Sequence, residues 1–326
     1  MIRRDFLAMM GGLAFWPLTA HARQGGMPVV GFLNSGSAPA FGDFVTAFKQ
    51  GLGDQGFVEG SNMRIDFRWA DGKYGALDAL AGELVHNKVD LIAATGGVVS
   101  AKAALKATKS IPIVFVVGFD PVALGLVASL NKPGGNATGV SLFTTELAAK
   151  RIELLYELAP DIHTVAFLVD PKAVVTEIEV RETIAAIQRS GRQLLVLKAT
   201  NEAEIDAAFA AAAEQHPGGL VVSADPVFTG RAAQIVSLAA RYGIPAVYPV
   251  REYVDAGGVM SYGPGLDHAY RDVGNYAGRI LKGANPSTLP VELPTTFNLV
   301  LNLKAAKAMS ITVSSLLLAI ADEVIE

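Results

Sequence analysis

Residues 89–97 read Val-Asp-Leu-Ile-Ala-Ala-Thr-Gly-Gly, and this stretch indicates the fold class of the chain. Residues 89–94 form a short run rich in apolar side chains, which is typical of a strand covered on both faces. Thr95, Gly96 and Gly97 follow the run and lie directly before a helical stretch. A strand that passes through a turn of small residues into a helix is the repeating unit of parallel α/β proteins.

The same unit recurs along the chain. Strands and helices in alternation predict right-handed βαβ units and a parallel sheet. Residues 63–69 differ, because apolar and charged side chains alternate there, and this alternation predicts a strand at a sheet edge. Further strands are expected at residues 29–33, 113–117, 165–169, 193–197, 220–223, 259–262 and 297–302, with helices at 44–52, 146–158, 178–189, 203–214, 231–242 and 267–281.

The alternation runs twice, which predicts two lobes. Residues 131–136, Asn-Lys-Pro-Gly-Gly-Asn, form a turn-rich break between the two sets. The later elements are too few for a third domain, so they are expected to pack on the first two. We therefore predict an α/β protein with two Rossmann-like lobes, parallel sheets and three crossovers between the lobes. The N-terminal lobe would hold residues 28–141 and about 262–285, and the C-terminal lobe residues 142–261 and about 286–326.

The first 22 residues have the pattern of an export signal. Arg3-Arg4 precedes an apolar stretch over residues 7–18, and Ala20-His21-Ala22 provides a small-x-small cleavage site. The paired arginines resemble a twin-arginine signal, although Ile2 stands where that pattern has Ser or Thr, so the general export route stays open. We expect cleavage near Ala22 and a periplasmic protein. The alternative interpretation is a buried N-terminal helix.

Composition excludes several classes of function. The net charge of −4 and the lack of basic runs argue against nucleic-acid binding. No segment after the signal reaches the roughly 18 apolar residues of a membrane span. The chain has no cysteine, which excludes disulfides, thiolate nucleophiles and cysteine-ligated metals.

The sequence offers no catalytic set. Residues 51–56, Gly-Leu-Gly-Asp-Gln-Gly, match the letters of a dinucleotide fingerprint. A true fingerprint follows a strand and opens a helix, whereas this one ends a helix, so its glycines are expected to serve a helix C-cap and a turn. The histidines have no partner at metal-ligand spacing, and no serine has a local general base. We predict a protein that is not an enzyme and uses no metal or cofactor.

The candidate ligand-binding residues lie in the loops that follow the strands, where open α/β sheets bind ligands. N–H groups at helix starts, with the hydroxyls of Ser35 and Thr95, would bind a carboxylate. Acidic side chains of the facing half would bind an ammonium group, and aromatic rings would cover a flat apolar group. Ordinary helix capping is the alternative for any single loop. The candidate residues are Ser35, Ser37, Thr95, Gly96, Gly97, Gly118, Phe119, Asp120, Phe143, Asp170, Lys172, Asp225, Phe228, Tyr248 and Glu252.

Several long blocks match one known family in the order expected of it. They are the signal with Arg-Arg-x-Phe-Leu, residues 56–60 leading to Arg68-Trp69-Ala70, and residues 256–263, 294–304 and 321–325. Over nearly its whole length the chain resembles the ABC-transporter substrate-binding proteins of the tryptophan/tyrosine-binding (TrpX-like) type. The resemblance implies a type I periplasmic-binding-protein fold with the ligand in the cleft, and delivery to an inner-membrane ABC permease with its ATPase.

The resemblance leaves the ligand open. By position it implies Thr95-Gly96-Gly97 for a carboxylate, Asp225 for an amino group, and Phe119 or Tyr248 for an aromatic ring. Lys172 departs from the neutral loop expected at its position, and it would either favour a second negative charge on the ligand or be solvated. We expect a monomer that binds a small carboxylate-bearing solute, an aromatic amino acid or aromatic acid, by hinge closure.

Three other functions are alternatives for such a sequence. A periplasmic module that senses a ligand for a membrane receptor would have the same sequence features. A nucleotide-dependent α/β enzyme would need a fingerprint after a strand, which the sequence lacks. A repressor-type ligand-binding core is disfavoured by the export signal and by the lack of a DNA-binding helical segment.

Overall fold

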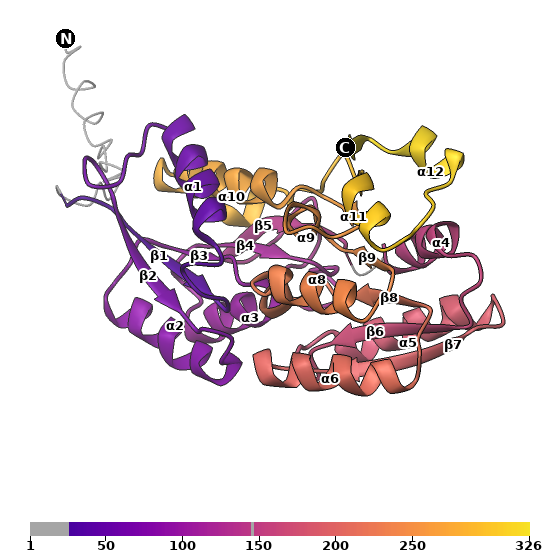
Figure 1. The fold of residues 1–326 in the computed structure, drawn as a ribbon. Coiled ribbons are helices and arrows are strands. Elements are labelled where there is room, and N and C mark those ends of the chain that lie inside the picture. Colours follow the sequence, from indigo (N-terminus) through magenta and orange to yellow (C-terminus); the bar gives the residue numbers. More distant parts are fainter. Residues whose placement is uncertain (1–25, 145–146) are drawn as a thin grey trace, which may run out of the picture.

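The computed structural model describes residues 26–144 and 147–326. The predicted export signal, residues 1–22, lies outside the described residues. Within them the chain forms two sheets, each covered by helices on both faces (Figure 1). The predicted α/β architecture with two sheets is therefore confirmed.

The first sheet is parallel throughout and has the strand order β2-β1-β3-β4-β5. β2 lies at its edge, as its alternating sequence predicts, and its apolar residues Ile65, Phe67 and Trp69 pack on the cluster at one face of the sheet. The strands are β1 (Val29–Asn34), β2 (Arg64–Trp69), β3 (Leu91–Ala94), β4 (Ile113–Val117) and β5 (Ala137–Ser141). One face is covered by α1 (Gly42–Asp54) and α10 (Leu266–Leu281), the other by α2 (Leu77–His86) and α3 (Gly97–Ala107), with the 3-10 turn η1 (Tyr74–Ala76) before α2.

The second sheet has the strand order β12-β11-β10-β9-β8-β6-β7. Its pairs are parallel except for β10 with β11, so the prediction of parallel sheets holds for all but this pair. The strands are β6 (Thr164–Val169), β7 (Gln193–Lys198), β8 (Gly219–Val222), β9 (Ala246–Tyr248), β10 (Met260–Gly263), β11 (Asn298–Asn302) and β12 (Glu323–Ile325).

Two groups of helices cover the second sheet. α4 (Ala148–Leu158), α5 (Thr176–Gln188), α11 (Leu303–Ala308) and α12 (Ser315–Ile320) contribute to the apolar cluster on one face. α6 (Glu202–Glu214), α7 (Pro226–Thr229), α8 (Ala232–Arg241) and α9 (Glu252–Asp255) contribute to the cluster on the other face.

The chain passes between the sheets three times: after β5, between β10 and α10, and after the 3-10 turn η2 (Pro286–Thr288). The third passage comes later than the boundary expected at about residue 285. Glu292 bridges Val140 of β5 and donates its N–H to Gly139 O at 2.8 Å, so residues up to Glu292 pack on the first sheet. The division into lobes at the other boundaries stays a prediction.

Two of the glycines at 51–56 have structural roles, one in the packing of two helices and one in a turn. A Cβ on Gly51 would lie 1.9 Å from Arg271 O, and one on Gly274 would lie 2.1 Å from Phe48 O. These glycines let α1 and α10 pack in backbone contact. Gly56, with φ +80°, takes the left-handed conformation of the turn after α1. C-capping was therefore the correct interpretation for Gly56, but Gly51 is required for the contact between two helices.

Candidate functional site

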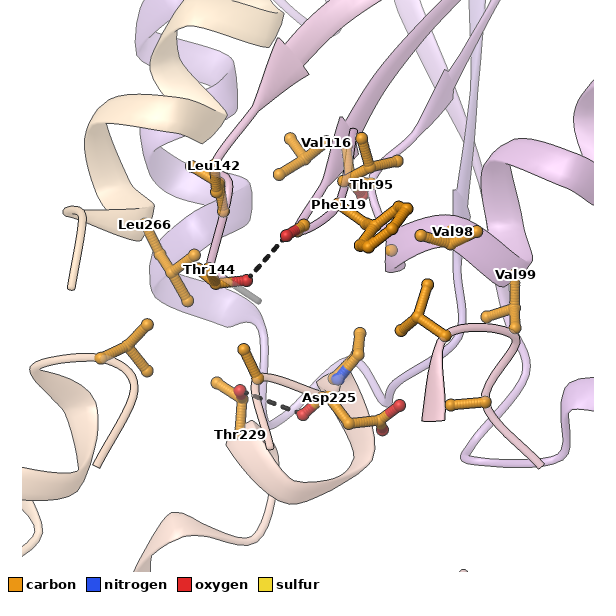
Figure 2. Close-up of a pocket in the computed structure, with 18 of the residues that line it drawn as sticks. Thr95, Val98, Val99, Val116, Phe119, Leu142, Thr144, Asp225, Thr229 and Leu266 are labelled. Atoms are coloured by element: carbon orange, nitrogen blue, oxygen red, sulfur yellow. Dashed lines mark hydrogen bonds between the residues drawn. The ribbon is translucent and has the colours of Figure 1, made fainter. Parts of the chain in front are cut away.

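A cavity lies where the carboxyl ends of the strands of both sheets face each other. The cavity leaves about 80 Å³ for the centres of water-sized spheres, and together with its open mouth it spans about 790 Å³. Figure 2 shows Thr95, Phe119 and Thr144 from the first sheet and its following segments, with Asp225 and Thr229 of the second lobe opposite.

Thr95 is the polar centre of the first-lobe wall. It follows β3, and its side chain is buried. The amide of Asn34 donates to Thr95 Oγ1 at 3.1 Å, and the hydroxyl of Tyr270 donates to Thr95 O at 2.8 Å. Because Thr95 Oγ1 already accepts a hydrogen bond, its own proton is available to a ligand oxygen.

The start of α3 lies beside Thr95. Gly96 is its N-cap residue, with no capping side chain, so the first N–H groups of this helix of 11 residues are left without an N-cap side-chain acceptor. Gly97 has φ +74°, and a Cβ there would lie 3.1 Å from Pro226 Cγ of the opposite lobe. The missing side chain lets the second lobe approach the helix start, which favours an anion.

Most of the remaining wall is apolar. Figure 2 shows Val98, Val99, Val116, Phe119, Leu142 and Leu266 around the cavity. Phe119 is the aromatic side chain that the sequence predicted for this position. Branched aliphatic side chains outnumber aromatic rings in this wall. An apolar group of a ligand would therefore be held mainly by aliphatic side chains that pack on the edges and faces of that group.

Asp225 is the main polar group of the second-lobe wall. Its Oδ1 caps α7 by accepting the Val227 N–H at 2.8 Å, and it also accepts the hydroxyl of Tyr74 at 2.5 Å. Burial raises the pKa of Asp225 to about 7, although the bond from Tyr74 opposes this shift. Within residues 26–144 and 147–326, Asp225 Oδ2 has no hydrogen-bond partner, so it is available to a ligand donor.

Glu179 is a second carboxylate at the cavity. It lies in the first turn of α5, is buried, and accepts the hydroxyl of Ser223 at 2.7 Å. The fully buried guanidinium of Arg151 is close enough for the charge of Glu179 to raise its pKa, while burial, the larger effect, lowers that pKa to about 10. Because Arg151 compensates Glu179, Asp225 is the carboxylate more available to a ligand cation.

Arg151 also forms hydrogen bonds to the backbone of two of the segments that connect the sheets. Its Nη2 donates to Thr144 O at 2.6 Å, and its Nη1 donates to Tyr262 O at 3.4 Å. Thr144 lies just after β5 and Tyr262 lies in β10. The buried cation therefore fixes the backbone where the two lobes are joined.

The charged side chains that line the cavity are acidic. Among the described residues, Glu179 and Asp225 line it, and no Lys, Arg or His does. Arg151 compensates Glu179, so a ligand that carried only negative charge would leave Asp225 as the carboxylate without a cation among the residues that line the cavity. The described residues also contain no group of three His, Asp or Glu side chains suited to a metal ion.

Five predicted site residues line this cavity: Thr95, Gly97, Gly118, Phe119 and Asp225. Gly118 accepts the hydroxyl of Thr144 at 3.1 Å through its carbonyl oxygen. These five come from both halves of the sequence, as the expected convergence of loops requires. Their contact with a ligand stays a prediction.

Other predicted residues stabilise the loops instead. Ser35 is buried and donates its hydroxyl to Gly96 O at 2.8 Å, and a Cβ on Gly96 would lie 2.0 Å from Ser35 N. Asp120 and Asp170 accept the N–H groups two residues later, at 2.8 and 2.7 Å. For these four residues, the loop-forming alternative describes the contacts that the structure shows.

The remaining predicted residues lie away from the cavity. Phe228 and Tyr248 are buried in the core of the second lobe, where Tyr248 stacks on Tyr253 with ring centroids 4.7 Å apart. Phe143 is half-buried with φ 47°, and its neighbours Leu142 and Thr144 line the cavity instead. Two other pockets hold the rest: Ser37 and Lys172 line one, and Glu252 lines another.

Sequence reasoning missed several residues at or next to the cavity. Thr144, Glu179 and Thr229 line it, and Tyr74 reaches Asp225 from the first lobe. Thr144 and Thr229 each come one position after a predicted site residue, Phe143 and Phe228, so the sequence pattern had already indicated the loops that contain them. Glu179 has the appearance of a solvated helix residue, and nothing in its local sequence marks it as buried.

Comparison with known proteins places this geometry in a class. The structure of an ABC domain in complex with L-Trp from Streptococcus pneumonia matches with a TM-score of 0.81 at 25% identity, covering 92% of this chain and 100% of that one. A conserved domain protein from Vibrio cholerae matches with a TM-score of 0.84 at 25% identity, over 92% of this chain and 100% of that one. More distant matches, such as a leucine binding protein from Thermotoga maritima at 13% identity and a TM-score of 0.56, over 78% of this chain and 81% of that one, share the fold.

Two helix-covered sheets with a cavity between them form the type I periplasmic-binding-protein fold, which the chain shares with these distant matches. The family described as ABC transporter substrate binding protein matches residues 30–325. The chain belongs to this family. It is also similar to a curated tyrosine-binding protein of Clostridioides difficile, with 27% identity over 262 residues, 80% of this chain and 75% of that protein.

One further comparison concerns the arrangement of the lobes. A structure described as the ligand-free, open form of a substrate binding protein from Clostridium difficile has a TM-score of 0.63, at 26% identity over 92% of this chain and 99% of that one. The L-Trp complex has similar identity and coverage but scores 0.81. The present structure therefore overlays better on the ligand complex than on the open form.

Proposed function

We propose that this substrate-binding protein binds a zwitterionic amino acid with a large apolar side chain, such as tryptophan or tyrosine, and delivers it to an ABC permease. The observation that carries the ligand class is the division of the cavity between its two walls. Thr95 and the start of α3 offer donors on one side, and Asp225 offers an acceptor on the other. Apolar side chains line the space between them.

Each wall matches one group of an amino acid. The carboxylate would accept from the Thr95 hydroxyl and the N–H groups at the start of α3. The ammonium would donate to Asp225 Oδ2, with Thr144 and Thr229 close by. The L-Trp complex of the pneumococcal protein and the name of the tyrosine-binding relative support this class of ligand.

The acidic lining favours an amino acid over an aromatic acid. Both were compatible with the sequence, but an acid without an amino group would leave Asp225 without a ligand cation, whereas Glu179 has Arg151. Closure would then bury the negative charge of the ligand near the carboxylate of Asp225, which is costly at low dielectric.

The ligand class is tested with three related compounds on residues 23–326, unfolded and refolded to remove bound ligand. L-Tryptophan has both charged groups, indole-3-propionate lacks the amine, and tryptamine lacks the carboxylate. At 100 times its dissociation constant a ligand adds about 2.7 kcal/mol of stability, which raises the melting temperature by several degrees. We expect this shift with L-tryptophan alone. An equal shift with indole-3-propionate would contradict the assigned role of Asp225.

Export and delivery belong to the same proposal. The sequence pattern of residues 1–22 supports export to the periplasm, and no helix among the described residues is long and apolar enough to cross a membrane. Replacing Arg3-Arg4 by Lys-Lys and fractionating cells tests the twin-arginine route, because that route depends on the arginine pair. Unchanged periplasmic yield would assign the chain to the general export route.

A further inference from the structure

Tyr74 contacts both lobes but is not among the residues that line the candidate ligand cavity. It begins η1, in the first lobe, and its hydroxyl donates to Asp225 Oδ1 of the second lobe at 2.5 Å. Its half-buried ring packs against the apolar cluster on one face of the first sheet and also against a cluster of the second sheet. Both the polar and the apolar parts of this side chain therefore contact the opposite lobe.

The Tyr74–Asp225 bond also separates two spaces in the cleft. Asp225 lines the ligand cavity, whereas Tyr74 lines an outer pocket together with Ser37 and Lys172. Pro226 lines both spaces. The hydrogen bond and Pro226 thus form part of the wall between the cavity and the outer pocket.

The bond has the features of a contact that forms on closure. Tyr74 and Asp225 are 151 residues apart and belong to different lobes, so opening the cleft would separate them. Burial and the charge of Asp225 keep the pKa of Tyr74 well above its usual value, so its hydroxyl remains a donor. Asp225 Oδ1 would lose this donor in an open form, while its capping bond to Val227 lies within the second lobe and would remain.

We propose that Tyr74 is a positioning residue that latches the lobes in the closed state and closes the cavity toward the outer pocket. The proposal rests on the proposed function, because it assumes that the cavity holds the ligand. Tyr74 acts through Asp225: it holds Oδ1, which leaves Oδ2 directed to the ligand. Its loss should increase the rate of ligand release more than it changes the rate of association.

The first experiment measures lobe closure without relying on any ligand. The sequence has no cysteine, so spin labels can be placed at His86→Cys on α2 and Ala210→Cys on α6, both exposed positions. Distances between the labels are measured in the parent, in Tyr74→Phe and in Tyr156→Phe. The control removes a hydroxyl that bonds Ser190 within the second lobe.

We expect the ratio of closed to open molecules to fall about tenfold in Tyr74→Phe, the effect of losing one hydrogen bond to a charged group, and to stay unchanged in Tyr156→Phe. The second experiment measures the release of L-tryptophan by stopped flow, where Tyr74→Phe should release it about tenfold faster. Equal label distances in all three proteins, with and without L-tryptophan, would overturn the latch.

The two proposals can fail separately. If L-tryptophan leaves the parent unchanged but Tyr74→Phe still lengthens the label distance, the ligand class is wrong and the latch is retained. If L-tryptophan binds and Tyr74→Phe changes neither the distance nor the release rate, the ligand class is retained and the latch is wrong. A fall in melting temperature of Tyr74→Phe without either change would assign Tyr74 a purely structural role.

Discussion

The two walls of the cavity are built in different ways. The first-lobe wall presents donors: the Thr95 hydroxyl and the start of α3, fixed by Asn34 and Tyr270. The second-lobe wall presents acceptors, of which Asp225 is fixed by its capping bond and by Tyr74. Neither wall by itself matches an amino acid. The carboxylate and the ammonium group of an amino acid would therefore bind to different lobes, so binding both groups would require the two walls to be close together.

The largest expected effect comes from removing the charge of the second wall. Asp225→Asn should weaken L-tryptophan binding about 100-fold at pH 8, because a charge-assisted hydrogen bond is lost inside a buried site. Asn is as good an N-cap as Asp, so α7 should keep its start. Isothermal titration calorimetry measures the dissociation constant.

Glu252→Gln is the matched control for this variant. Burial raises the pKa of Glu252 to about 7, as it does for Asp225, but Glu252 lines a different pocket. Its replacement should leave the dissociation constant unchanged. Equal losses in the two variants would mean that general electrostatics, and not the second wall, governs affinity.

The contrast between the walls also shows which parts of the site a sequence can reveal. Thr95, Gly97 and Asp225 lie within three positions of the end of a strand. The carboxyl ends of parallel strands lie on the same side of the sheet, which brings such residues together. Glu179 and Arg151 could not be found in this way. Charged residues within helical patterns have the same sequence appearance whether solvated or buried, and here the packing of α4 and α5 buries them.

The strands, too, could be predicted from the sequence only in part. Long apolar runs predicted most strands to within about two residues, but β5, β9 and β12 were missed. β5 reads Ala-Thr-Gly-Val-Ser, which is fully buried although it lacks an apolar run. Its Gly139 is required because a Cβ there would lie 2.1 Å from Phe115 O of β4. Such a close approach is a property of the neighbouring strand and is not visible in the local sequence.

The second wall should make binding depend on pH. Asp225 has a pKa of about 7 in the ligand-free protein, and an ammonium ligand favours its ionised form. The favourable interaction is therefore fully present above pH 7 and is lost as pH falls, by nearly tenfold in affinity for each unit below 7. Calorimetry with L-tryptophan between pH 8 and 5.5 measures this slope. The slope should disappear in Asp225→Asn, and a slope that persisted there would assign the titration to another group.

The first wall should contribute less, because a neutral hydroxyl is its only side-chain donor. Thr95→Val keeps the shape but removes the donor, and should weaken L-tryptophan binding about fivefold to tenfold, since the N–H groups of α3 remain. Thr46→Val, at an exposed hydroxyl that bonds Gly42 O within α1, is the control and should bind as the parent does. A loss in Thr95→Val as large as that in Asp225→Asn would show that the two walls contribute equally.

The smallest effect is expected at Lys172, which lines the outer pocket and would be a second anion site for a ligand that extended there. Lys172 is exposed, its Nζ lies 3.4 Å from Thr200 Oγ1, and it lines the outer pocket. Solvent and salt screen an exposed charge, so Lys172→Ala should change the dissociation constant of L-tryptophan less than about twofold at 150 mM salt. A tenfold loss, measured by calorimetry, would instead mean that the ligand extends past Tyr74 into the outer pocket, and the division of binding between only two walls would then be wrong.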